Sequence, residues 1–350
     1  MSRLWKQGMA FAALAAVVGL WCLPPSLAAK PGGGGGGGTG GGTIYSLSRL
    51  SVYGLNSMMS DGTAKSALPP NVSGDPSRLL HGGFRWFLPL RITAGAVPSY
   101  PDGQKRWELF AVREDGDESL TVQLTDDPTL QFIGNIHYDQ RVRWAPGEGA
   151  NSGMIAGMAQ RWVLDGSQWQ VDPDSIGVYT ATVLFDTDGN VDGLDAPPAL
   201  LVTLPGNLGP PDFDWSPDLL EIVYATSDGR ELRIVDVLTG AFRTLCVADN
   251  DGWTYSPAWS PDGSLIAFWT EWNINTIRPD GTGEKEIIRR APGFGFYSPH
   301  WSPTASHLVC NCWYWSQGDR YDLYRFTASG GGKTNLTADI AEWVLPVAWR

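Results

Sequence analysis

Short apolar runs separated by turn residues recur along most of the chain, and the stretch SPAWSPDGSLIAF at 256–268 shows the pattern most clearly. A first run ends at Trp259, Ser-Pro-Asp-Gly follows, and a second run begins at Leu265. Short apolar runs bounded by Gly, Pro, Asp and Ser are typical of β-strands, and Pro-Asp-Gly between them is typical of a tight turn. The stretch therefore predicts two antiparallel strands joined by a turn.

The same pattern recurs around six tryptophans. The copies are PDFDWSPDLLEIVYAT from 211, SPAWSPDGSLIAFWT from 256 and SPHWSPTASHLVC from 298, with weaker copies FRWFLPLRI from 84, RVRWAPGEG from 141 and a truncated LPVAWR from 345. Their tryptophans are Trp86, Trp144, Trp215, Trp259, Trp301 and Trp349. The last four are 44, 42 and 48 residues apart. Repeats of this length are typical of β-propellers, in which each repeat forms one four-stranded sheet.

Each repeat also contains two further strand-like segments. A third segment ends in a glycine turn, as in RELRIVDVLTG, NINTIRPDG, RYDLYRFTASGGG and ELFAVREDG, and a short fourth follows, as in AFRTLCV, EKEIIRR, KTNLT and SLTVQLT. Asp-Gly and Gly-Gly between alternating runs favour hairpins, because glycine adopts positive φ readily. Each repeat is therefore predicted to be a four-stranded antiparallel blade.

The two ends of the chain complement one another. The last repeat stops at Trp349-Arg350 after its first strand, and the segments IYSLSRLS, VYGLNSMMSDGT and AKSALPP from position 44 supply three more. Pairing these ends would cover strand edges that otherwise favour aggregation. We therefore predict an all-β, six-bladed β-propeller of four-stranded antiparallel blades over residues 44–350, closed by strand exchange between the N- and C-termini.

SPAWSPDGSLIAF, together with NTIRPDGTGEKEI, resembles the WD40-like β-propeller repeat of the TolB family. Two copies are close, one is moderate and three are eroded, and the resemblance covers residues 44–350. The resemblance implies the fold rather than one activity, since such propellers occur in periplasmic TolB, before serine peptidase domains and in oligogalacturonate lyases. The chain departs from TolB because a glycine-rich segment, and no α/β domain, precedes its propeller.

The first residues have the features of a secretory signal. Arg3 and Lys6 precede an uncharged, mostly apolar run at 8–23, and small residues follow it. We predict a signal peptide at 1–28 with cleavage near Ala28 or Ala29, and a periplasmic or secreted protein. A membrane anchor is less favoured because the run is shorter than the ~30 Å hydrocarbon core, and a lipoprotein is disfavoured by Leu20-Trp21 before Cys22.

Residues 29–43 contain KPGGGGGGGTGGGT, whose composition predicts a flexible linker. The formal net charge of the chain is −12, so we expect neither nucleic acid nor a membrane surface as a partner and no membrane insertion after cleavage. Three cysteines would remain after cleavage, Cys246, Cys310 and Cys312. An odd number favours buried free thiols over a disulfide framework, and a Cys-x-Cys metal site lacks a second pair of ligands. We expect a monomer.

No catalytic residues are predicted. The chain has no Gly-x-Ser-x-Gly segment, which a serine peptidase of the α/β-hydrolase type requires. Its histidines, His81, His137, His300 and His307, lie at different offsets from the repeated tryptophans, so convergence on one metal is not expected. The tryptophans themselves are expected to pack between blades.

One segment, FDTDGNVDGLD at 185–195, has the composition of a cation site. Asp186, Asp188, Asn190 and Asp192 alternate with residues that permit a tight wrap, and Ca²⁺ prefers such oxygen ligands. Ala199 occupies the position at which an EF-hand loop has its last carboxylate. The alternatives are a tentative Ca²⁺ site, the only cofactor considered, and an ordinary acidic hairpin turn.

The segments 93–105 and 145–175 are expected to be loops over the faces of the propeller, because they are rich in Gly, Ser, Asp and Pro. The predicted function is an exported, non-catalytic scaffold that binds a protein or peptide in the cell envelope. The alternative is an enzyme acting on polysaccharide through the central channel, as an oligogalacturonate lyase or a glycan hydrolase. Five further tryptophans are either binding hot spots or packing between blades: Trp253, Trp269, Trp272, Trp313 and Trp315.

Overall fold

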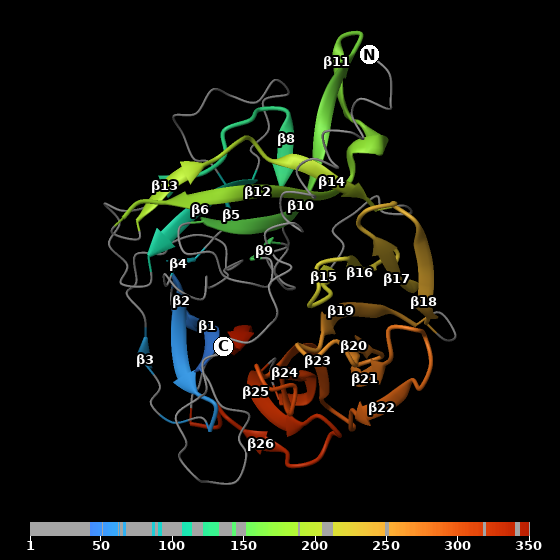
Figure 1. Cartoon of the computed structure of the whole chain (residues 1–350). Coiled ribbons are helices and arrows are strands. Elements are labelled where there is room, and N and C mark those ends of the chain that lie inside the picture. Colours follow the sequence, from blue (N-terminus) through green and yellow to red (C-terminus); the bar gives the residue numbers. More distant parts are fainter. Residues whose placement is uncertain are drawn as a thin grey trace.

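The computed structural model is all-β, and its sheets lie around a common centre (Figure 1). It describes residues 43–50, 52–61, 63, 66–67, 86–87, 90–92, 107–113, 122–132, 142–144, 152–187, 190–204, 213–248, 252–317, 320–339 and 344–349. The predicted signal peptide at 1–28 and the loop expected at 93–105 lie outside these residues, and so does all but the last residue of the linker at 29–43. In the part that is described, no helical segment has the length and apolar character needed to cross a bilayer.

Three consecutive sheets have four antiparallel strands each, in chain order. The first contains β15 (Phe213–Trp215), β16 (Glu221–Ala225), β17 (Glu231–Asp236) and β18 (Phe242–Val247). The second contains β19 (Thr254–Trp259), β20 (Ile266–Thr270), β21 (Asn273–Ile277) and β22 (Lys285–Ile288). The third contains β23 (Gly295–Trp301), β24 (His307–Tyr314), β25 (Arg320–Thr327) and β26 (Thr334–Asn335). The four-stranded unit predicted for these repeats is confirmed.

A fourth four-stranded sheet joins the two ends of the chain. Its order is β27 (Val344–Trp349), β1 (Thr43–Leu50), β2 (Val52–Met59) and β3 (Ser66–Ala67). β27 runs antiparallel to β1, with Ile44 opposite Trp349 and Ser48 opposite Val344. Arg325 of β25 donates a hydrogen bond to the carbonyl of Ser60, just beyond β2, and so links this sheet to its neighbour. The predicted pairing of the terminal strands is therefore present.

The intervening stretch forms one larger sheet of eleven strands. Its members are β4 (Trp86–Phe87), β5 (Leu90–Ile92), β6 (Trp107–Arg113), β7 (Val122–Gln123), β8 (Leu130–Phe132), β9 (Val142–Trp144), β10 (Ser152–Asp165), β11 (Gln168–Val171), β12 (Gly177–Phe185), β13 (Val191–Leu194) and β14 (Ala199–Thr203). The sequence divides this stretch at Trp86 and Trp144 into two separate repeats. The structure instead connects it through β10, which pairs with β8, β9, β11 and β12.

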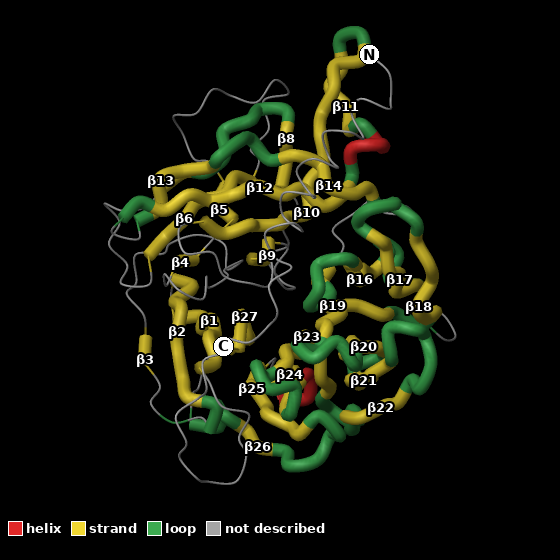
Figure 2. The backbone as a smooth tube through the Cα atoms, in the orientation of Figure 1, coloured by secondary structure: helices red, strands yellow, loops and turns green. Residues whose placement is uncertain are grey.

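The prediction of a loop at 145–175 is wrong over most of that range. Residues 152–165 form β10, which has 14 residues, and residues 168–171 form β11. Ile155 to Ala159 are all buried, because strands pair with β10 on both sides and residues of β15 and β16 pack against it. A strand buried on both faces shows no alternation of apolar and polar residues. The Gly, Ala and Met residues at 153–159 therefore gave no period-two signal from which a strand could be predicted. The β10–β11 hairpin projects beyond the rest of the sheet (Figure 2).

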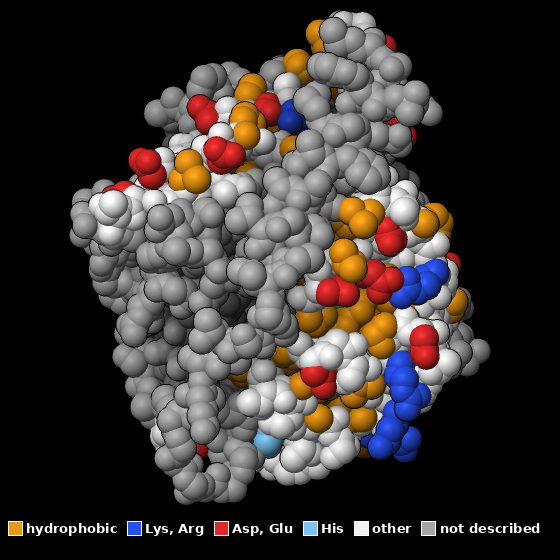
Figure 3. Space-filling view, in the orientation of Figure 1, with side chains coloured by type: hydrophobic (Ala, Val, Ile, Leu, Met, Phe, Trp, Pro, Cys, Tyr) orange, Lys and Arg blue, Asp and Glu red, His pale blue; other side chains and the backbone are white. Residues whose placement is uncertain are grey.

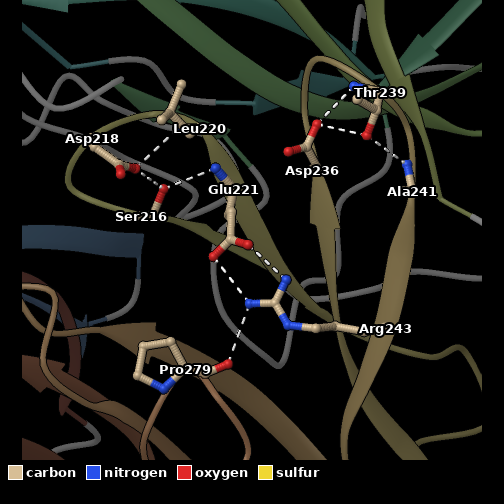
Figure 4. Close-up of polar contacts among 9 residues, drawn as sticks. All are labelled: Ser216, Asp218, Leu220, Glu221, Asp236, Thr239, Ala241, Arg243 and Pro279. Atoms are coloured by element: carbon tan, nitrogen blue, oxygen red, sulfur yellow. Dashed lines mark hydrogen bonds and ion pairs between the residues drawn. The ribbon is translucent and has the colours of Figure 1, made fainter.

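The repeated Ser-Pro-Asp segment is a side-chain-stabilised turn (Figure 4). Ser216 Oγ donates to Asp218 Oδ1 at 2.6 Å and accepts from the backbone N–H of Glu221 at 2.9 Å. The matching bonds in the next repeat, from Ser260 to Asp262 and from the Leu265 N–H to Ser260, measure 2.7 and 2.9 Å. Ser and Asp favour turns because their side chains can replace backbone hydrogen bonds in this way. These residues are structural.

The repeated tryptophans that the structure describes with their side chains pack against the preceding sheet. Trp215 lies in one buried cluster with Ala156 and Val178 of the eleven-stranded sheet. Trp301 lies in a cluster with Ala267 of β20, and its indole N–H donates to the Ala258 carbonyl at 2.9 Å. Trp259 lies in a third such cluster, and its backbone N–H donates to Asp214 Oδ2 at 2.8 Å. The expectation that these tryptophans pack between sheets is confirmed.

Candidate functional site: an aromatic surface

Four of the five additional tryptophans gather at one end of two neighbouring sheets. Together with three tyrosines they form what we call the Trp272 cluster: Tyr255, Trp269, Trp272, Tyr297, Trp313, Trp315 and Tyr321. The fifth tryptophan, Trp253, immediately precedes β19 and is 50% exposed. The sequence left two interpretations open for the five tryptophans, binding hot spots or packing between blades. Most of them have features of both, because they pack between the two sheets and also reach the surface.

Strand register explains why these rings share one end of the sheets. At the start of β19, Tyr255 lies opposite Trp269, near the end of β20. In the next sheet, Trp313 near the end of β24 lies opposite both Gly295 at the start of β23 and Tyr321 at the start of β25. Antiparallel pairing thus places the ends of the second strands beside the starts of the first and third strands.

Trp272 is the centre of the cluster. Its ring stacks on Trp269 with centroids 5.2 Å apart, and it lies 5.0 Å from Trp313 and 5.9 Å from Trp315. Its contact with Tyr297 is edge-to-face at 6.1 Å. These separations are those at which aromatic pairs attract one another beyond the burial of their surface. The cluster is therefore a rigid aromatic surface rather than a set of independent side chains.

The turn that holds Trp272 is conformationally unusual. Thr270 pairs with Asn273, so only Glu271 and Trp272 connect β20 to β21, and their φ angles are 51° and 67°. Two-residue hairpins with positive φ at both positions strongly prefer Asn-Gly or Asp-Gly, because a Cβ atom is unfavourable there. Backbone strain of this kind concentrates at functional sites. The turn places a tryptophan and a carboxylate where the sequence would be expected to have glycine and asparagine.

The neighbouring sheet is shaped to receive this turn. A Cβ on Gly295 would lie 2.3 Å from the Cβ of Trp272, so only glycine fits at that position. The backbone N–H of Phe296 donates to the Trp272 carbonyl at 2.8 Å. The position of the Trp272 ring is therefore fixed from both sheets.

Two matching β-bulges position Tyr255 and Tyr297. The register of β19 shifts between Tyr255 and Ala258, and that of β23 shifts between Tyr297 and His300. The serine after each tyrosine, Ser256 or Ser298, has φ of 48°. Bulges re-aim side chains and often lie beside binding sites. Sequence reasoning missed these tyrosines, although the repeated Tyr-Ser-Pro before two of the tryptophans was a usable signal.

Part of the cluster is open to solvent. Trp315 is 38% exposed, and Trp272, Trp313 and Tyr321 are half-buried. Glu271, beside Trp272, is exposed. Trp and Tyr are the residue types most enriched at binding hot spots. The surface thus combines fixed aromatic groups with one carboxylate.

The acidic segment at 185–195 lies elsewhere, between β12 and β13. Asp186 accepts hydrogen bonds from the backbone N–H of Asn190 at 2.8 Å and from its side-chain amide at 3.1 Å. Asp192 is exposed within β13, and Asp188 lies outside the described residues. Asp186 and Asn190 therefore close the hairpin turn, and the Ca²⁺ site stays a prediction. In the described ranges, no group of three or more His, Cys, Asp and Glu side chains is placed to hold a metal.

The three cysteines that the structure describes are free thiols, as expected. Cys310 and Cys312 are buried in β24, and Cys246 is partly buried. Burial raises the pKa of Cys310, and it raises the pKa of Cys246 and of Cys312 to about 12. Since the thiolate is the reactive form, these residues are unreactive at neutral pH.

The histidines with described side chains do not converge. His307, at the start of β24, is buried and forms a bond with the Ser306 hydroxyl through Nδ1, whereas His300 lies in β23. His81 and His137 lie outside the described residues.

No protein-family model matches the chain, and no curated protein matches it. Solved structures do. A TolB from Agrobacterium tumefaciens matches with a TM-score of 0.50 and 15% identity over 85% of this chain and 88% of its own. A chain of the Nidogen/Laminin complex matches with 0.50 and 9% identity over 86% and 93%. Kuenenia stuttgartiensis hydrazine synthase matches with 0.55 and 11% identity, over 89% of this chain and 48% of its own.

These proteins have different names, so the likeness concerns architecture. Identities this low extend to the course of the backbone and not to the residues of a site. The sheets arranged around one centre, the repeated Trp-Ser-Pro turns and these matches agree. The fold of this chain is a TolB-like β-propeller.

Proposed function

We propose that the protein is a non-catalytic binding scaffold whose Trp272 cluster docks a protein or peptide. The observation that carries this proposal is the strained Glu271-Trp272 turn at the centre of a partly exposed aromatic surface. An aromatic cluster that served only to fill space between two sheets would need neither a positive-φ tryptophan nor a tryptophan that is 38% exposed. Rigid rings lose little conformational entropy on binding, which makes them effective anchors.

The proposed scaffold is a closed ring over residues 44–350 in which the eleven-stranded sheet supplies two of six blades and each four-stranded sheet supplies one. The β1–β27 pairing supports this closure. In this proposal, residues 1–28 direct export and are removed, residues 29–43 form a flexible linker before the ring, and the mature protein acts as a monomer in the periplasm or outside the cell. These parts of the proposal come from the sequence.

The partner is proposed to be basic or polar. The formal net charge of −12 disfavours acidic partners, and Glu271 adds a carboxylate at the aromatic surface itself. The face seen in Figure 3 carries Asp and Glu side chains among hydrophobic ones, whereas Lys and Arg side chains lie mostly toward its outer edge. Acidic side chains interspersed in this way would steer a basic segment toward the molecule.

The test is capture of partners from the envelope fraction of the source organism. Wild-type protein is compared with Trp315→Ala, which removes an exposed ring of the cluster, and with Trp169→Ala, a matched control on the β10–β11 hairpin. We expect the Trp315 variant to lose a specific partner that the control retains. Removal of a hot-spot residue weakens binding by about 2 kcal/mol or more, roughly thirtyfold. Equal capture by both variants would place the binding surface elsewhere.

The alternative is an enzyme acting on polysaccharide. It is favoured by the same aromatic surface, because tryptophan rings also stack on sugar rings. Turnover of an acidic oligosaccharide by the purified protein, with activity lost on adding a chelator, would support the enzyme and contradict the scaffold.

A further inference from the structure

A second aromatic site lies in the β23–β26 sheet and shares no ring with the Trp272 cluster. The Lys333 ammonium nitrogen lies 4.8 Å from the centroid of the Phe294 ring, 5.1 Å from that of Phe296 and 4.7 Å from that of Tyr324. All three distances are within the ~6 Å at which a cation is attracted to an aromatic face. Three rings thus surround one ammonium group, and we call them the Lys333 cage.

The walls of the cage hold one another in place without Lys333. Phe294 and Phe296 meet edge-to-face at 5.8 Å and 89°, and Phe296 and Tyr324 meet at 5.9 Å and 89°. Tyr314 backs Phe294 at 5.3 Å, and its hydroxyl bonds the hydroxyl of Tyr324. The Lys333 ammonium group lies over the faces of all three rings, so the negative faces of these rings meet at one point. The cage is therefore preorganised for a cation.

A polar network fixes Tyr324 from behind. The Asn335 amide donates to the Tyr324 hydroxyl at 3.2 Å and to Asp322 Oδ2 at 2.8 Å. Asp322 is 2% exposed, and Arg320 Nε donates to its Oδ1 at 3.1 Å. A network of buried, satisfied polar groups is rigid. The Tyr324 wall should therefore keep its position when the occupant of the cage changes.

Lys333 itself is held weakly. It is exposed, and no described carboxylate lies within ion-pair distance of its ammonium group. It follows a glycine turn in which Gly330 and Gly332 have φ of 87° and 63°. A lysine side chain has several rotatable bonds, so it can leave the rings without movement of a strand. The occupant is exchangeable, whereas the cage is fixed.

We propose that the Lys333 cage is a binding site for a small quaternary ammonium ligand, which Lys333 keeps closed in the free protein. Aromatic cages bind quaternary ammonium groups by cation–π attraction, and such groups are less strongly hydrated than a primary ammonium. Lys333 competes with the ligand from within the same chain, which lowers the apparent affinity of the wild-type site. This site uses none of the rings of the Trp272 cluster, although its wall residue Phe296 donates its backbone N–H to the Trp272 carbonyl.

The test is titration with tetramethylammonium chloride, with sodium chloride at equal ionic strength as the reference. We expect a dissociation constant at least tenfold lower for Lys333→Ala than for wild type, and no change for Lys285→Ala, a matched lysine on β22. Adding Phe294→Leu to the Lys333 variant removes one aromatic wall with little loss of volume and should abolish the gain. A folded Lys333→Ala variant that shows no saturable binding overturns the proposal.

A measurement on the wild-type protein keeps the test valid if the Lys333 variant fails to fold. The ε-methylene protons of Lys333 should resonate upfield because of the surrounding rings, and should move downfield as tetramethylammonium displaces the side chain. If these resonances do not shift on addition of tetramethylammonium, the proposed site is wrong. Titration with choline and co-sedimentation with phosphatidylcholine vesicles then separate a free ligand from a lipid headgroup.

Discussion

The stretch from β15 to β26 and the stretch from β4 to β14 come from one repeat pattern but differ in how the sheets separate. In the first stretch, each repeat has Trp-Ser-Pro, and the serine hydroxyl accepts the N–H that follows the turn, at 2.9 Å from Glu221 and from Leu265 and at 3.1 Å from His307. In the second stretch, the matching segments are Trp-Phe-Leu-Pro and Trp-Ala-Pro-Gly, which have no such hydroxyl.

The comparison shows what the turn chemistry provides. A side-chain-bonded turn ends one strand and starts its partner at a defined residue, so each repeat closes into its own four-stranded sheet. Without that turn, β10 extends over 14 residues and pairs with strands on both sides, so that two predicted repeats form one sheet. The predictions below test this difference, from the largest expected effect to the smallest.

Deletion of residues 344–350 should have the largest effect. It removes β27, which in the described sheet pairs with the edge of β1 opposite to β2. The deletion therefore exposes a strand edge, which favours aggregation. We expect loss of cooperative unfolding or formation of aggregates, measured by calorimetry and light scattering. A truncated protein that stays monomeric with an unchanged melting temperature would contradict the proposed closure.

Two tryptophan substitutions compare the two stretches directly. Trp301→Ala should lower the free energy of unfolding by about 3–5 kcal/mol, because the ring is 6% exposed and packs between two regular sheets. Trp162→Ala in β10 should lower it by about 1 kcal/mol, because that ring is half-buried. Both indoles donate one hydrogen bond, to Ala258 and to Gln131, so burial is the main difference. Equal losses of unfolding free energy in denaturant titrations would show that the regular sheets are no more tightly packed than the eleven-stranded sheet.

Acid should weaken the turns of the regular stretch. Hydrogen bonds from Ser260 lower the pKa of Asp262, and those from Thr226 lower the pKa of Asp228. A carboxyl group whose pKa is lower in the folded protein stabilises it above the unfolded pKa, and this contribution is lost as pH falls through the folded value. The midpoint temperature of unfolding should therefore decrease when the pH is lowered below about 4.

The matched variant is Asp262→Asn, which keeps the acceptor oxygen and removes the charge. We expect a smaller fall of the unfolding midpoint between about pH 5 and pH 3 than in wild type. Both groups are largely exposed, so the effect per residue is small. Identical pH profiles for the two proteins would assign the acid sensitivity to other groups.

Calcium should give the smallest effect, and only in the irregular stretch. If the segment at 185–195 binds Ca²⁺, chelator-treated protein should release heat on titration and gain a few degrees in melting temperature, and Asp188→Ala should abolish both. No heat from the unmutated protein would leave only the turn that Asp186 and Asn190 close.

The sequence determined much of the regular architecture. Strand, turn and glycine signals are local, and they correctly predicted the strands from β15 to β26 and the pairing of the two chain ends. It also identified four tryptophans of the Trp272 cluster. Local signals sufficed because each Ser-Pro-Asp turn forms most of its hydrogen bonds within about five residues.

Only the tertiary structure decided how strands from different repeats meet. The assignment of 152–165 as a strand depends on partners on both sides of β10, which no local pattern reveals. The Trp272 cluster depends on the register of two sheets, on a positive-φ turn without glycine and on the space that Gly295 leaves. The Lys333 cage joins residues from three parts of one sheet. Contacts between residues distant in sequence are set by packing, and packing became visible only in the folded chain.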